Sequence, residues 1–187
     1  IKTQKLMHKF ANKLKENNQE NLKLLLKICL SLASDEDDLL EIIYFKNIDN
    51  RFTIGIGNPV LRQRLFEKFN ALGGKFESTI SPFARIGNFG STIGEGCNIM
   101  TGTVITNDVE IKCGVLVNLN CTIGHDSIIG NFVEMSPGVH ISGNCIVGDY
   151  SVLGTNAIVL PKVKIGTNVI IGAGSVVTKD VPDNCLV

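Results

Sequence analysis

A histidine and an aspartate stand side by side at positions 125 and 126. An imidazole with an ordinary pKa of about 6.5 can remove a proton from an amine or a hydroxyl group at neutral pH. A neighbouring carboxylate can hold the imidazole in one tautomer and stabilise its cation. The pair therefore suggests general base catalysis by His125, with Asp126 as its partner. Two plainer interpretations stay open: His125 could be an exposed turn histidine, and Asp126 could serve only the geometry of a turn.

A repeat of six residues must position this pair. Steps of six from Ile93 to Val177 give fifteen aliphatic positions without an insertion. The residue two before each is small or Val, and the residue three after is Gly, Asn or Asp in twelve of the fifteen hexads. The exceptions are Phe132, Tyr150 and Lys162. Three phases in register predict a solenoid of hexapeptide repeats.

Each hexad predicts one short strand and one corner. The aliphatic residue and the small residue point inward, following the two-residue alternation of a strand. The Gly, Asn or Asp position then takes the positive φ that a repeated corner needs. Three strands per coil predict eighteen residues per turn, so the fifteen hexads predict five coils. His125 would project outward from a corner, with Asn107 and Gly143 one coil away on either side.

The first eighty residues lack the hexad and predict a small α/β domain. Its expected elements are a helix around residues 6–14, an apolar strand within 22–32, a helix after the acidic run 35–38, a strand over 51–57, a helix from Asn58–Pro59 to Gly73–Gly74, and a strand over 75–80. We therefore expect two domains, residues 1–82 and residues 83–187.

Composition narrows the class of protein. The net charge is zero, which gives no bulk attraction toward nucleic acid or anionic membranes. No apolar run reaches 18 residues and no signal peptide is recognisable, so we expect a cytoplasmic protein without a membrane segment. Cys97, Cys121 and Cys145 fall on the small inward position, 24 residues apart, which predicts core residues and not a disulfide or a metal site.

The segments TIGHDSIIGNFVEMSPGVHISGNCIVGD and IGAGSVVTKDVPDN closely resemble the hexapeptide sugar acyltransferases. The nearest branch is that of sialic acid O-acetyltransferases, which also contains N-acetyltransferases of nucleotide-linked 4-amino sugars. The resemblance covers the whole solenoid and, more weakly, residues 51–86. It implies a left-handed parallel β-helix, a Rossmann-like first domain for the substrate, and a homotrimer with acetyl-CoA between neighbouring prisms. It makes His125 the catalytic base and Asp126 its acidic partner.

Three further residues follow from this resemblance. The transition state needs a donor for its oxyanion, and the main-chain N–H of Gly143, stacked on His125, suits that role. The phosphates of CoA suggest Lys162 and Lys179 as cofactor-binding residues. Plainer roles stay open, because Gly143 could serve corner geometry and the lysines could be ordinary solvated side chains.

The chain also departs from the family. The nucleotide-binding first domain usually opens with a glycine-rich turn, and Ile1 to Phe10 contain no glycine. Ser81 stands where a histidine is common before Pro82, and Glu134 replaces a second histidine. The family's short tail is absent after Val187. We expect that the α/β domain is incomplete and that the sequence is truncated at both ends.

We therefore predict an acetyl-CoA-dependent acetyltransferase that acts on an amino or hydroxyl group of a sugar, or a nucleotide sugar, without a metal. The alternative is a non-catalytic trimeric scaffold or sugar-binding module. A zinc hydratase on the same fold would need three converging histidines, and the solenoid has only His125 and His140. His140 should point outward, at the surface or at a subunit contact, and His8 should lie on a helix surface. A serine acetyltransferase shares the solenoid, but its helical first domain does not fit residues 1–82.

Overall fold

The computed structural model of the protein describes residues 49–187. Contacts divide it into two compact units. Of the described residues, the first unit contains 49–52 and 69–75, and the second contains 53–68 and 76–187. The two helices and the strand expected before residue 49 lie outside the described residues, as does His8.

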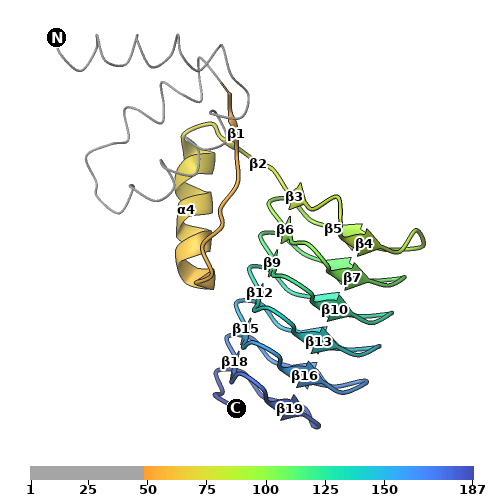
Figure 1. Cartoon of the computed structure of the whole chain (residues 1–187). Coiled ribbons are helices and arrows are strands. Elements are labelled where there is room, and N and C mark those ends of the chain that lie inside the picture. The colour runs from red at the N-terminus through yellow and green to blue at the C-terminus, as the bar shows by residue number, and fades with distance from the viewer. Residues whose placement is uncertain (1–48) are drawn as a thin grey trace, which may run out of the picture. The chain divides into compact units, whose positions relative to one another are not determined.

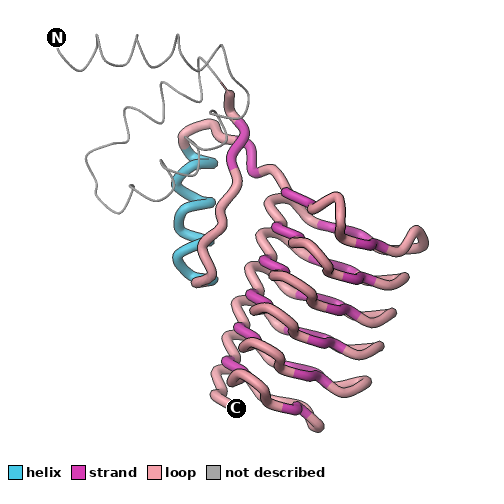
Figure 2. Tube along the Cα trace, in the orientation of Figure 1, coloured by secondary structure: helices cyan, strands magenta, loops and turns pink. Residues whose placement is uncertain are grey.

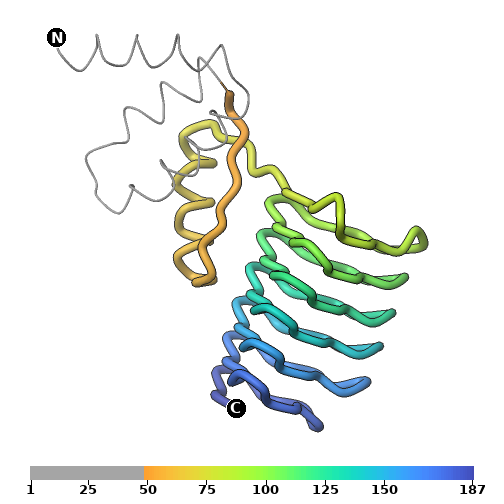
Figure 3. The backbone as a smooth tube through the Cα atoms, viewed as in Figure 1, coloured from red at the N-terminus to blue at the C-terminus, as the bar shows by residue number. Residues whose placement is uncertain are grey.

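The second unit is dominated by a parallel β-solenoid, whose stacked coils are visible in Figures 1 and 3. Its strands are two residues long, and from Thr92 onward each pairs in parallel with the strand eighteen residues away, as Thr122 does with His140. They form three sheets, which we call the first, second and third faces. The first face contains β4 (Arg85–Ile86), β7 (Val104–Ile105), β10 (Thr122–Ile123), β13 (His140–Ile141), β16 (Ile158–Val159) and β19 (Val176–Val177).

The second and third faces complete each coil. The second contains β5 (Thr92–Ile93), β8 (Glu110–Ile111), β11 (Ile128–Ile129), β14 (Ile146–Val147) and β17 (Lys164–Ile165). The third contains β3 (Thr79–Ile80), β6 (Asn98–Ile99), β9 (Leu116–Val117), β12 (Glu134–Met135), β15 (Val152–Leu153) and β18 (Ile170–Ile171). Figure 2 shows these short strands alternating with turns along every coil.

The prediction of five coils is one too few, because the solenoid has about six turns. The extra turn includes β3 and β4, which pair with β6 and β7. Steps of six backward from Ile93 reach Gly87 and miss Ile86, since one additional residue separates Ile86 from Ile93. The solenoid strand β3 also lies before residue 83, where the second domain was expected to begin.

Both positional predictions for the hexad are confirmed. The aliphatic positions from Ile99 to Val177 are all at most 4% exposed, and they line a single apolar core. The corner position takes a positive φ in fourteen of the fifteen hexads, including the exceptions Phe132, Tyr150 and Lys162. The remaining corner residue, Asp180, instead accepts a hydrogen bond from the backbone N–H of Lys164 at 2.8 Å. The same packing rule thus fixes the register of every coil.

One helix occurs among residues 49–187, α4 (Pro59–Ala71). Its start was predicted correctly, and the Asn58 side chain caps it by accepting from the Leu61 N–H at 2.9 Å. The strand expected over 51–57 is shorter, because only β1 (Arg51–Phe52) pairs, with β2 (Lys75–Phe76). Beyond β1, the Asn98 side chain donates to the Ile54 carbonyl at 2.8 Å, which takes the place of a strand partner.

The described part of the first unit has contacts of its own. The Phe52 and Phe69 rings meet edge to face, with centroids 5.2 Å apart. Arg51 pairs with Asp49 at 2.8 Å, and this hydrogen-bonded pairing lowers the pKa of the Asp49 carboxyl. Gly73 follows α4 with a φ of 89°, which glycine adopts without strain. The predicted Rossmann-like domain is not shown by these residues, and the division at residue 82 stays a prediction.

Candidate active site

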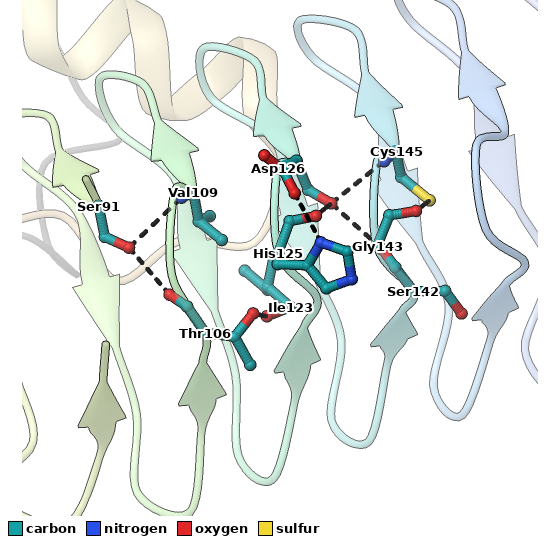
Figure 4. Close-up of polar contacts among 10 residues, drawn as sticks. Ser91, Thr106, Val109, Ile123, His125, Asp126, Ser142, Gly143 and Cys145 are labelled. Carbon is teal, nitrogen blue, oxygen red and sulfur yellow. Dashed lines mark hydrogen bonds and ion pairs between the residues drawn. The ribbon is translucent and has the colours of Figure 1, made fainter. Parts of the chain in front are cut away.

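His125 and Asp126 lie at the corner between β10 and β11, and their side chains are in direct contact (Figure 4). The His125 Nδ1 atom is 2.6 Å from the Asp126 Oδ2 atom. Neighbouring side chains of a strand diverge, but Asp126 has a φ of 57°, in the left-handed region, so the corner departs from strand alternation. An ionised carboxylate can only accept a hydrogen bond, so in the neutral imidazole this contact places the proton on Nδ1 and leaves the Nε2 lone pair available.

The pair is open to solvent. The His125 side chain is 62% exposed and that of Asp126 is 56% exposed. The backbone nonetheless fixes the corner, because the Asn144 N–H donates to the His125 carbonyl at 2.7 Å. The Asp126 N–H donates to the Asn107 carbonyl on the other side at 3.3 Å. A base that is anchored through its main chain and exposed at Nε2 can receive a proton from a molecule bound at the surface.

Gly143 lies beneath the His125 ring, as Figure 4 shows. A Cβ atom on Gly143 would lie only 2.7 Å from His125 Nε2 and 2.9 Å from Cε1. Gly143 does not have a positive φ; the left-handed residue of this corner is Asn144, at 60°. Close approach of the imidazole, and not corner geometry, is therefore the reason for glycine here. Within residues 49–187, the Gly143 N–H donates to no protein acceptor.

The two predicted CoA-binding lysines lie on the same edge of the solenoid as His125. Lys162 follows β16, and its N–H donates to the Gly143 carbonyl at 3.1 Å. Lys179 follows β19, three coils from His125, which corresponds to roughly 14 Å at the usual strand spacing. Both are exposed, and neither ammonium group takes part in a hydrogen bond or ion pair among the described residues. Of the three predicted cofactor-binding residues, only Gly143 lies against His125.

The other residues of interest lie elsewhere. His140 is exposed on the first face, as predicted, and its Nδ1 is 2.9 Å from the Thr122 hydroxyl. Cys97, Cys121 and Cys145 are fully buried, also as predicted. Within residues 49–187, no group of three His, Cys, Asp or Glu side chains is placed to hold a metal ion. No helix in this range is long and apolar enough to cross a membrane.

A buried arginine was not predicted. Arg62 of α4 is fully buried, and its guanidinium donates to the carbonyls of Ile56, Gly57, Gly114, Phe132 and Val133 at 2.6–3.1 Å. Burial lowers its pKa to about 10, while the charge of Glu134 opposes the shift. In an amphipathic helix that also contains Arg64, nothing in the sequence separates Arg62 from a surface residue.

Glu134 belongs with Arg62 and not with His125. It lies on the third face, is 7% exposed, and accepts a hydrogen bond from the Ser136 hydroxyl at 3.0 Å. Burial raises the pKa of the Glu134 carboxyl, and the Ser136 hydrogen bond and the Arg62 charge oppose this. The replacement of the family's second histidine by Glu134 therefore supplies a counter-charge to the buried guanidinium.

The fold is that of the hexapeptide-repeat acyltransferases. Residues 144–179 match the family model for the bacterial transferase hexapeptide, described as six repeats. No curated protein sequence matches the chain.

Solved structures narrow the class further. The chain is similar to the perosamine N-acetyltransferase PerB of Caulobacter crescentus, whose structure contains CoA and GDP-perosamine. The two chains are 32% identical, the match covers 80% of this chain and 72% of PerB, and the TM-score is 0.77. It is similar to the acetyltransferase domain of PglB from Neisseria gonorrhoeae, with 33% identity, coverage of 77% and 72%, and a TM-score of 0.72. WeeI from Acinetobacter baumannii gives 30% identity, coverage of 73% and 66%, and a TM-score of 0.71. The chain belongs to the hexapeptide-repeat sugar acetyltransferases, which use acetyl-CoA.

Proposed function

We propose that the protein transfers the acetyl group of acetyl-CoA to the amine of a nucleotide-linked amino sugar. The single observation that carries the proposal is the corner at which His125, held by Asp126, lies over the bare backbone of Gly143. The similarity to PerB, which is bound to CoA and GDP-perosamine, supports a nucleotide-linked acceptor. Of the two acceptor groups left open by the sequence, the amine is the one acetylated by that relative.

The chemistry assigns one task to each group. The acceptor nitrogen attacks the thioester carbonyl carbon while His125 Nε2 takes its proton, and Asp126 stabilises the resulting imidazolium. The Gly143 N–H donates to the oxygen that becomes negative. The carbon–sulfur bond then breaks, and the imidazolium returns its proton to the departing CoA sulfur. General base catalysis of this kind contributes about 10²–10⁴-fold to a rate.

Lys162 and Lys179 extend the proposed site toward the end of the solenoid. Both ammonium groups are exposed and unpaired among residues 49–187, and they follow Gly143 along one edge. Phosphates of CoA carry the charge that such groups attract. We assign them to CoA binding, so replacing both with Met should raise KM for acetyl-CoA and leave kcat nearly unchanged.

We also propose that the protein is a homotrimer. The outward positions beside the His125 edge include exposed aliphatic side chains, with Val104 38%, Val176 55% and Ile146 38% exposed. Burying such side chains against a second copy removes apolar surface from water. The mass of the protein in solution, measured by light scattering, tests this: a monomer would contradict it. A cytoplasmic location stays a prediction.

The test of function is acceptor-dependent release of the CoA thiol. The full-length protein would be assayed with acetyl-CoA against nucleotide-linked amino sugars, free amino sugars and sialic acid. We expect release with the nucleotide-linked amines and a loss of about 10²–10⁴-fold in His125→Ala. The matched control is His140→Ala, an exposed histidine with its own hydrogen bond, which should keep full activity. If His125→Ala is as active as the wild type, His125 is not the base. Release only with sialic acid would transfer the assignment to a hydroxyl acceptor. No release and no CoA binding would favour the non-catalytic module.

A further inference from the structure

A buried hydroxyl group holds the backbone on which the His125 ring lies. Ser127 is fully buried and occupies the small inward position of its hexad. Its Oγ donates to the Ser142 carbonyl at 3.1 Å and accepts from the Cys145 N–H at 3.1 Å. These two partners lie on either side of Gly143. Ser127 therefore binds the Gly143 corner from inside the solenoid, while His125 covers it from outside.

The Ser142 hydrogen bond shows the direction of the Gly143 N–H. The peptide bond between Ser142 and Gly143 is trans, so its C=O and N–H point in opposite directions. Since the carbonyl points inward to Ser127, the N–H points outward, and no described residue accepts it. A hydrogen bond to the carbonyl also polarises the peptide and strengthens its N–H as a donor.

Gly124 packs directly against this peptide from the preceding coil. A Cβ atom at Gly124 would lie 2.5 Å from the Gly143 nitrogen and 2.6 Å from the Ser142 carbonyl carbon. Like Gly143, Gly124 does not have a positive φ, so turn geometry does not require it. Gly130 and Gly148 approach the next coil equally closely, so the stacking of coils accounts for glycine at position 124, and Gly143 is the glycine specific to the His125 corner.

The fold does not need a hydroxyl at this position. Ala157 and Val133 occupy the same inward position in other hexads and are fully buried without any hydroxyl. Cys121 shows that a thiol can make the equivalent contact, since its Sγ donates to the Ser136 carbonyl at 3.3 Å. Ser151 repeats two of the three Ser127 contacts, donating to the Gly166 carbonyl at 2.8 Å and accepting from the Val169 N–H at 3.0 Å. The third, a weaker contact of 3.4 Å from Ser127 Oγ to the His125 carbonyl, has no counterpart at Ser151. No histidine covers the corner that Ser151 holds.

We propose that Ser127 is a positioning residue for acetyl transfer, which aims and polarises the Gly143 N–H toward the oxyanion. The inference rests on the proposed function. Loss of a complete oxyanion donor lowers kcat by about 10²–10³-fold. Loss of its support leaves the donor in place, so Ser127→Ala should lower kcat by about tenfold, with KM for acetyl-CoA unchanged. Ser127→Cys should keep most of the activity, because the thiol can donate to the same carbonyl.

The experiment compares Ser127→Ala, Ser127→Cys and the matched control Ser151→Ala in the full-length protein. Steady-state kcat, KM for acetyl-CoA and the melting temperature would be measured for each. A purely structural role predicts that the two alanine variants lose equal stability and equal activity. We expect equal losses of stability but a fall in kcat only for Ser127→Ala, restored by Ser127→Cys. Equal kcat in the two alanine variants overturns the inference and leaves the proposed function standing, while an inactive wild type overturns both.

Discussion

Gly143→Ala tests whether bare backbone beneath the imidazole is required. The new Cβ atom would lie 2.7 Å from His125 Nε2, whereas carbon contacts favour about 3.5–4 Å. The ring must therefore move by roughly 1 Å, and a displacement of that size can lower a rate by about 10²-fold. The fold should tolerate the change, because Gly143 has no positive φ and the His125 side chain is 62% exposed and free to swing away.

The assay is thiol release from acetyl-CoA at saturating acceptor, together with thermal unfolding. We expect kcat to fall by about 10²-fold in Gly143→Ala, with little change in melting temperature. Gly55→Ala is the matched control, because nothing lies within 4 Å of its added Cβ atom and its φ is not positive. It should match the wild type in both measurements.

A double variant distinguishes displacement of the ring from any other effect of the methyl group. In a His125→Ala background there is no imidazole to displace, so adding Gly143→Ala should lower the residual rate much less than it does in the wild type. Wild-type kcat in Gly143→Ala would refute the steric reasoning. The same fold-loss in both backgrounds would show that the glycine acts independently of His125.

Three further predictions concern the rest of the structure. Arg62→Met should lower the free energy of unfolding by about 3–5 kcal/mol, because five carbonyls and the buried Glu134 lose their partner. Chemical denaturation measures this free energy, and a loss below about 1 kcal/mol would contradict the prediction. Because the pKa of Glu134 is raised in the folded state, the folded protein binds a proton at this carboxyl at a higher pH than the unfolded chain does. As the pH falls from neutral to about 4.5, the wild type should therefore gain stability relative to Glu134→Gln. Denaturation midpoints across that range check the sign, and the opposite slope would refute it. Burial raises the thiol pKa of Cys97 and Cys121 to about 11, so neither should react with a thiol reagent at pH 8 until the protein unfolds, whereas rapid labelling of the native protein would contradict their burial.

The hexad predicted the solenoid well because its packing leaves little freedom. An inward residue every six positions, followed by a left-handed corner, determines the register of each coil, and Phe132 obeys the rule without being Gly, Asn or Asp. The same dependence explains the missed coil, since one extra residue between Ile86 and Ile93 hides an earlier strand from a strict six-residue step.

The site was less accessible from sequence because it depends on directions. The sequence placed His125 at a corner and Gly143 beside it, but contact with Asp126 depends on the backbone of Asp126 itself. The role of Ser127 depends on which way one carbonyl points, and a serine at that position does not reveal this. The burial of Arg62 depends on carbonyls from coils more than fifty residues away, so the sequence around Arg62 does not predict it.

Because strands eighteen residues apart pair in parallel, equivalent positions along the His125 edge repeat once per coil. A residue can be moved along this edge only in steps of one coil, about 4.8 Å, because a smaller insertion rotates the following side chains off the edge. Deleting residues 145–162 would bring Lys179 one coil closer to Gly143 and keep His125, Asp126 and Gly143 themselves. It would also remove Lys162 and put Val163 in the place of Cys145. The reach of a ligand that spans the edge can therefore be changed by whole coils without altering the corner at which the chemistry is proposed to occur.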